Sequence, residues 1–178
     1  MASANLLGIS GSLRQGATNT LLIKEAARLF GDATFTLADL NLPLYNGDEE
    51  AASGVPAAVQ ALSDQIATAD AVIISTPEYN KGPSGVLKNA LDWVSRTQGS
   101  PWNGKPVAVM SAAAGRAGGE RAQMILRSFM VPFRPVILQG PEIHLASSSE
   151  EFDQNGQLKS ERYAAQVTDL MSQLRALI

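Results

Sequence analysis

The stretch LLGISGSLRQGATNT, Leu6–Thr20, shows most directly how this chain folds. It begins as a short apolar run, 5–9, typical of a buried strand, and becomes a loop of small and hydroxyl residues with one arginine, Arg14. The pattern LLIKEAARLF follows at once, and its apolar residues recur every four positions, which predicts a helix over 18–30. A buried strand that leads through a loop into a helix is the beginning of an α/β unit.

The loop itself suits an anion. A helix start offers unpaired N–H groups and about half a positive charge, and small residues let an anion approach them. Arg14 adds a fork of donors that matches phosphate. The spacing of Gly8 and Gly11 fits neither a P-loop nor a dinucleotide fingerprint. The residues therefore favour a phosphate site, and a plain strand–helix turn capped by Thr18 remains the alternative.

The rest of the chain repeats the alternation of strand and helix. Apolar runs without a polar face are typical of parallel strands covered by helices on both sides. A fifteen-residue segment rich in turn residues, 42–56, is predicted to be a loop. The predicted strands are 5–9, 33–40, 71–77, 105–113 and 134–139, and the predicted helices are 18–30, 56–69, 84–96, 119–130 and 160–178. A doubly wound sheet of this kind binds its ligand at the carboxyl ends of its strands.

Composition narrows the possible functions. The 178 residues suit one domain spanning 1–178, and 45% hydrophobic residues are enough for a full core. A net charge of −3 disfavours a nucleic-acid partner, and no apolar stretch approaches the ~20 residues of a membrane span. Cysteine is absent and His144 is the only histidine, so no metal site or nucleophilic triad is expected. With no leader pattern visible, we expect a cytoplasmic protein.

Two further loops follow predicted strands at the same sheet edge. The segment TPEYNKGPS begins with Pro77, which ends its strand and fixes the backbone, and Tyr79 offers an aromatic surface. The segment SAAAGRAGG, starting at Ser111, contains no bulky residue except Arg116, so that a flat ring could lie against its backbone. Ordinary tight turns would look similar in both places.

The motifs GSLRQGATN (11–19), PEYN (77–80) and LKNALDW (87–93) resemble the NADPH-dependent FMN reductase family, close to its chromate and quinone reductases. The resemblance runs from Leu6 to about Arg127 and implies a flavodoxin-like, five-stranded parallel sheet in the order 2-1-3-4-5. It also implies non-covalently bound FMN and NADPH or NADH as electron donor. The cofactor-binding residues that it implies are Ser10, Ser12, Leu13, Arg14, Thr18, Asn19, Pro77, Glu78, Tyr79, Asn80, Ser111, Ala112 and Gly115.

Within that set the resemblance assigns different parts of the flavin. Ser12, Arg14 and Asn19 would hold the phosphate, and the PEYN residues would line the isoalloxazine ring. Ser111 and Ala112 would close the pocket. Many relatives have Ser at the position of Ala17, and Thr18 would replace that lost donor.

The implied reaction passes hydride from a nicotinamide to FMN and then electrons to a quinone, free flavin, chromate or a similar small acceptor. The flavin carries this chemistry, so no general acid or base is assigned. The alternatives are a flavodoxin-type electron carrier and a flavin-binding module without activity. The resemblance also implies a homodimer or homotetramer, for which the mixed faces of the helix 119–130 and Trp93 give modest support. Packing or a subunit contact is the simpler interpretation of Trp93, and His144 is read as a strand-end or surface residue.

Overall fold

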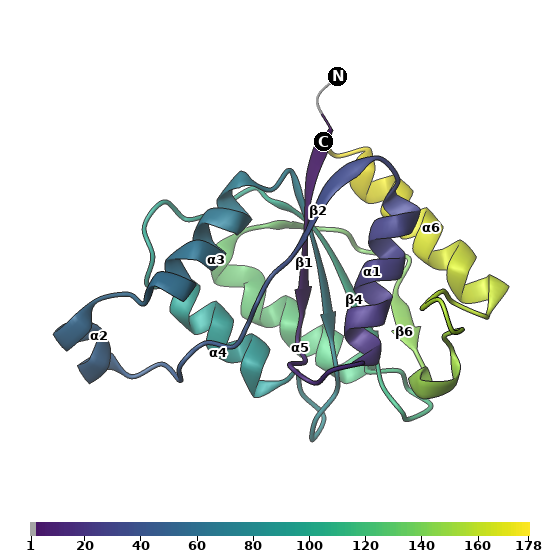
Figure 1. Ribbon diagram of the computed structural model, residues 1–178, viewed down its shortest axis with the longest axis horizontal. Helices are drawn as coiled ribbons and strands as arrows, with labels where there is room; N and C mark the ends of the chain where they lie inside the picture. Colours follow the sequence, from purple (N-terminus) through teal and green to yellow (C-terminus); the bar gives the residue numbers. More distant parts are fainter. Residues whose placement is uncertain (1–2) are drawn as a thin grey trace.

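The computed structural model describes residues 3–178 and places their strands in one parallel sheet between two layers of helices (Figure 1). The strand order is β2-β1-β3-β4-β5, and β6 also pairs with β4. The strands are β1 (Ala4–Ser10), β2 (Ala33–Leu37), β3 (Ala71–Thr76), β4 (Pro106–Ala112), β5 (Val136–Ile137) and β6 (Ile143–Leu145). The predicted flavodoxin-like fold and strand order are confirmed.

Helices cover both faces of the sheet, as Figure 1 shows. Helices α1 and α6 pack on one face, and α3, α4 and α5 pack on the other. The helices are α1 (Thr18–Phe30), α2 (Gly47–Ser53), α3 (Ala57–Thr68), α4 (Gly85–Val94), α5 (Glu120–Met130) and α6 (Glu161–Arg175), with 3-10 turns η1 (Val131–Phe133) and η2 (Ser148–Glu150).

Alternate residues of the central strands supply the two cores. Leu6 and Ile73 lie in the core beneath α1 and α6, whereas Leu7 and Ile74 lie in the core beneath α3, α4 and α5. Every residue of β3 is buried, which is why this strand has no polar face in the sequence. Among residues 3–178, no helix combines the length and apolar content needed to cross a membrane.

Two elements differ from the sequence-based expectation. The predicted fifth strand, 134–139, is shortened to β5, and β6, which the sequence did not predict, pairs with β4 after Gly140 and Pro141, where proline cannot donate to a strand ladder. The predicted loop 42–56 contains the short helix α2. Its signals were present, since Asn46 caps it by accepting from the N–H of Asp48 and its first turn is acidic.

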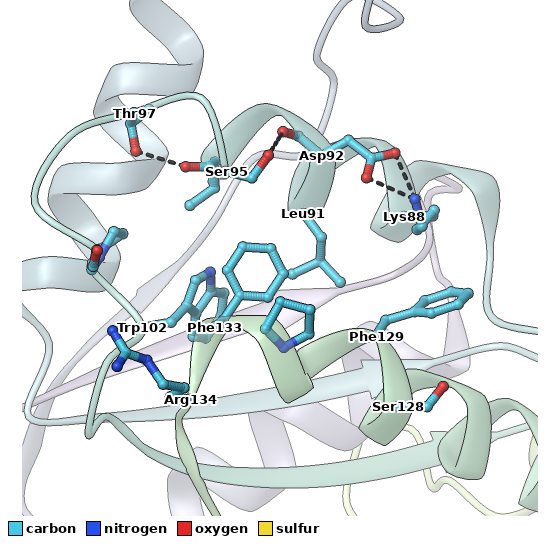
Figure 2. A pocket seen from close by; sticks show the side chains of 14 residues that line it. Lys88, Leu91, Asp92, Ser95, Thr97, Trp102, Ser128, Phe129, Phe133 and Arg134 are labelled. Carbon is cyan, nitrogen blue, oxygen red and sulfur yellow. Dashed lines mark hydrogen bonds and ion pairs between the residues drawn. The ribbon is translucent and has the colours of Figure 1, made fainter.

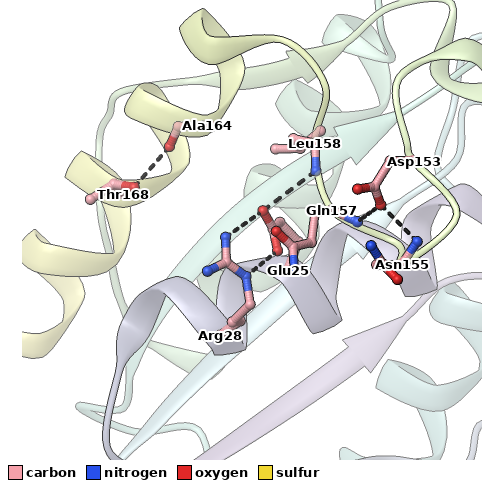
Figure 3. Close-up of polar contacts among 8 residues, drawn as sticks. All are labelled: Glu25, Arg28, Asp153, Asn155, Gln157, Leu158, Ala164 and Thr168. Carbon is pink, nitrogen blue, oxygen red and sulfur yellow. Dashed lines mark hydrogen bonds and ion pairs between the residues drawn. The ribbon is translucent and has the colours of Figure 1, made fainter.

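The C-terminal segment is fastened to α1 by a buried carboxylate (Figure 3). Glu25 is almost fully buried and receives two hydrogen bonds from Arg28, of 2.7 and 2.9 Å. The same carboxylate accepts from the backbone N–H of Leu158 at 3.4 Å. Removing a partner from a buried charge is costly, so this contact fixes the chain between β6 and α6 against α1.

Candidate functional site

Three loops meet at the carboxyl edge of the sheet, as a doubly wound fold requires of a ligand site. They follow β1, β3 and β4, and η2 adjoins them from the C-terminal segment. Together they enclose a cleft of about 280 Å³. Its lining residues are Ser12, Arg14, Ala17, Thr18, Asn19, Pro77, Glu78, Tyr79, Ala112, Ala113, Ala114, Ser148 and Ser149.

One end of the cleft is built to attract an anion. Helix α1 begins there without a side-chain cap and without an acidic residue in its first turn, so its N–H groups and dipole are left for a ligand. Ala17 is buried at the cap position, which keeps the approach open. The exposed side chain of Arg14 makes one long hydrogen bond, of 3.4 Å, to the carbonyl of Gln15. This end therefore offers backbone donors, hydroxyls and a guanidinium.

Asn19 ties the first turn of α1 to the ends of β3 and β4 beneath that loop. Its Oδ1 accepts from the Ser75 hydroxyl at 2.7 Å and from the Ala112 N–H at 3.0 Å. Its Nδ2 donates to the Ala112 carbonyl at 2.9 Å. Asn19 is buried, so these bonds replace water and set the spacing between the first turn of α1 and the ends of β3 and β4.

The other end of the cleft is less polar. Pro77, Tyr79 and small alanines line it. Tyr79 is 57% exposed, and its backbone exchanges two hydrogen bonds with Gly82. The two residues between them, Asn80 and Lys81, have φ of 51° and 69°, the conformation of a tight hairpin turn that non-glycine residues seldom adopt. The turn presents the Tyr79 ring at the mouth of the cleft.

Glu78 links this end to α5. Helix α5 receives no side-chain cap from Gly119, and the Glu78 Oε2 accepts instead from the Ala122 N–H at 3.2 Å. The carboxylate thereby complements the positive end of the α5 dipole. Gly119 has φ of 93°, and a Cβ there would lie 2.7 Å from the Cβ of Ser111, so only glycine lets the third loop pack this closely.

The structure sorts the residues named from the sequence into two groups. Eight of them line the cleft: Ser12, Arg14, Thr18, Asn19, Pro77, Glu78, Tyr79 and Ala112. The other five lie in the same loops or strand ends but outside its lining: Ser10, Leu13, Asn80, Ser111 and Gly115. Two of these support the loops from below. Ser10 accepts from the Thr20 hydroxyl at 2.8 Å, and Ser111 donates to the Gly118 carbonyl at 2.6 Å.

Sequence reasoning missed the wall contributed by the C-terminal segment. Ser148 and Ser149 follow β6 and line the cleft beside Thr18. The run SSSE is rich in hydroxyls, but nothing in its spacing places it next to a loop 130 residues earlier. His144, read as a strand-end or surface residue, is the middle residue of β6.

A second and larger hollow, of about 560 Å³, lies between α4, α5 and η1 (Figure 2). Its walls include Leu91, Trp102, Phe129 and Phe133, and Lys88 pairs with Asp92 at one side. Leu91 and Trp102 belong to the core cluster of that face. The hollow is lined by the aromatic and aliphatic edge of the core, whereas all three loops that follow central strands lead to the smaller cleft.

Comparison with known proteins agrees with the position of the cleft. Residues 4–150 match the profile of the family described as NADPH-dependent FMN reductase. The chain belongs to this family. The matched range contains all three loops of the cleft, and it confirms the predicted enzyme class and the predicted cofactors, FMN and NAD(P)H.

Several relatives share most of their length with this chain. An NAD(P)H-dependent FMN reductase of Pseudomonas aeruginosa is 44% identical over 159 residues, covering 88% of this chain and 85% of the relative. A 2-hydroxy-1,4-benzoquinone reductase of a Burkholderia species is 38% identical over 175 residues, covering 90% and 94%. The solved structure of FerB, a flavoenzyme NAD(P)H:(acceptor) oxidoreductase of Paracoccus denitrificans, has a TM-score of 0.87 at 32% identity, covering 98% and 96%.

The residues of the cleft fit FMN by their chemistry. The uncapped start of α1, with Arg14 and nearby hydroxyls, suits a phosphate, which carries up to two negative charges. Pro77, Tyr79 and Ala112 suit a flat heterocycle that needs apolar surface and backbone donors. The two ends of the cleft therefore match the two ends of the cofactor.

Proposed function

We propose that this chain, acting as one FMN-binding domain over 1–178, transfers reducing equivalents from NADH or NADPH to quinones and similar small acceptors, including free flavin and chromate. One observation carries the proposal: the three loops that follow β1, β3 and β4 converge on a cleft whose one end is uncapped and cationic and whose other end is lined by proline, tyrosine and alanines. Relatives named quinone reductase support the choice of acceptor.

In this proposal the first loop anchors the cofactor. Ser12, Arg14 and Thr18 donate to the phosphate together with the first-turn N–H groups of α1. Asn19 acts from beneath, because its hydrogen bonds to Ser75 and Ala112 fix the loop in place. The remaining predicted cofactor residues keep that role as a proposal, with those outside the cleft lining acting through backbone groups or through loop support.

The second and third loops orient the ring and exclude water from one side of it. Bound FMN would supply the capacity to accept hydride from a nicotinamide and to pass electrons onward. Pro77 and Ala112 line the cleft, and Tyr79 stands at its mouth, where a planar donor or acceptor would enter. Glu78 holds α5 in register with this loop through the Ala122 N–H.

We also propose a cytoplasmic homodimer or homotetramer. The exposed side of α5 carries Arg121, Met124 and Ser128, and Met124 is 64% exposed, which suits a subunit contact. Trp93 gives no support to this contact. It is fully buried, donates to the Pro43 carbonyl at 2.7 Å and packs edge-on against Tyr45, so the core interpretation applies.

The test uses FMN-loaded protein under anaerobic conditions. Addition of NADH or NADPH should bleach the visible flavin absorbance, and p-benzoquinone should restore it over repeated cycles. Protein that binds FMN but is not reduced by either nucleotide would instead be an electron carrier of the flavodoxin type. Protein that binds no FMN would overturn the proposal entirely. Light scattering at micromolar concentration tests the assembly, and a monomer would contradict it.

A further inference from the structure

The C-terminal segment reaches back to the first loop through one residue, Ser148. It opens η2, is 3% exposed, and its Oγ lies 2.9 Å from the Thr18 Oγ1. Thr18 is the first residue of α1, and both residues line the cleft. Two segments separated by 130 residues therefore join their hydroxyls at the anion-attracting end.

The position of Ser148 is fixed from two sides. Its N–H donates to the Ala113 carbonyl at 3.1 Å, and the Ala113 N–H donates to the Leu145 carbonyl at 3.0 Å. Farther along the segment, the Glu25 carboxylate accepts from the Leu158 N–H, which holds the chain against α1 (Figure 3). Ser148 is thus held between the third loop and α1, and it needs no rearrangement to meet a ligand in the cleft.

The hydroxyl pair of Thr18 and Ser148 has one hydrogen that is not used in the contact between the two side chains. Each hydroxyl carries one hydrogen, and the contact between Ser148 and Thr18 uses only one of the two. Within residues 3–178, neither hydroxyl oxygen makes a second hydrogen bond to protein. One hydrogen therefore remains available at the wall of the cleft, where leaving a buried donor unpaired is unfavourable.

We infer that Ser148 is a phosphate-binding residue of this enzyme: the Thr18–Ser148 pair donates its remaining hydrogen to a phosphate oxygen of FMN, so the C-terminal segment completes the phosphate site. This inference rests on the proposed function. It assigns a ligand contact to the part of the chain just beyond the three loops, and it explains how a cleft with Ala17 at the cap position regains a hydroxyl donor.

The test is a titration of FMN-free protein with FMN and, separately, with riboflavin, which lacks the phosphate. Ser148→Ala should weaken FMN binding about tenfold, the size of one charge-assisted hydrogen bond, and leave riboflavin binding unchanged. Ser147→Ala is the matched control, because Ser147 is exposed and lies outside the cleft lining. It should leave both affinities unchanged.

Two other results of the Ser148→Ala titration would count against the inference. Equal affinity of Ser148→Ala and the unaltered protein for FMN would overturn the inference, and so would equal losses for FMN and riboflavin, which indicate a purely structural role. Thr18→Val, which removes the partner hydroxyl with little change of volume, should shift FMN affinity in the same direction and serves if Ser148→Ala does not fold. Failure of the unaltered protein to bind FMN would refute the proposed function instead.

Discussion

The two hollows of this molecule differ in volume and in the chemistry of their walls, and the larger one is not the candidate ligand site. The hollow between α4, α5 and η1 is twice the volume of the cleft, about 560 against 280 Å³, yet it is the edge of a core with Leu91 and Trp102 at its base. The cleft is smaller, but strand ends, a helix start and three loops all converge on it. A ligand site is recognised by where unpaired donors gather, and volume alone does not reveal it.

The largest effect should come from the core hollow and should concern stability alone. Trp102→Ala removes a side chain that is 2% exposed and should lower the free energy of unfolding by about 3–5 kcal/mol. The folded fraction should bind FMN with unchanged affinity, because none of the described residues that line the cleft also lines the core hollow. Urea unfolding and an FMN titration measure the two quantities. A parallel loss of FMN affinity would show that the two hollows are coupled.

In the cleft, Asn19→Ala should change stability and binding together. The substitution leaves the Ala112 N–H and the Ser75 hydroxyl without their partner in a buried site, which should lower the free energy of unfolding by about 3 kcal/mol. FMN affinity should fall as well, since the loop loses its support. Asn155→Ala, at an exposed position, is the control and should stay within about 0.5 kcal/mol. Unchanged stability would show that the Asn19 bonds do not fix the loops.

Much of this arrangement could be predicted from the sequence, for an identifiable reason. The run LLGIS and the buried strand AVIIST show their burial directly in their composition, and the loops after them stand out by their small residues. Parallel strands bring the loops that follow them to the same edge of the sheet, whatever the sequences of the loops. This is why eight of the thirteen named cofactor residues line the cleft.

The rest of the site depends on contacts between distant segments, which no local sequence pattern predicts. The two hydroxyls of Thr18 and Ser148 meet only because β6 joins the sheet beside β4, and β6 is three residues long. Strands this short lack a readable period. Asn19 looked like a ligand residue from its motif, and only the structure shows that three hydrogen bonds already engage its side chain.

Arg14→Ala should weaken FMN binding by roughly 1.5–3 kcal/mol, or about 10- to 150-fold, with little change in stability. Arg14 is exposed, so its guanidinium contributes to the ligand more than to the fold. Arg134→Ala makes the same charge change beside the core hollow and should leave FMN affinity unaltered. Equal effects of the two substitutions would point to a general charge effect with no specific site.

The smallest effect should appear at the mouth of the cleft. Tyr79→Ala removes aromatic surface beside the ring or the incoming nicotinamide, a contact of about 0.5–1.5 kcal/mol. Steady-state rates with a quinone should change roughly two- to twelvefold, with stability within about 0.5 kcal/mol. Unchanged kinetics and flavin fluorescence would make Tyr79 an ordinary exposed turn residue. A large loss of stability in FMN-free protein would place it in the core instead.

The central claim is that the loop between β1 and α1 binds the phosphate of FMN. The most direct test titrates FMN-free protein with FMN and with riboflavin, for the unaltered chain and for Arg14→Ala. The unaltered chain should prefer FMN, and the substitution should remove most of that preference while leaving riboflavin binding unchanged. A preference for FMN that survives in Arg14→Ala, or an equal loss for both ligands, would contradict the claim.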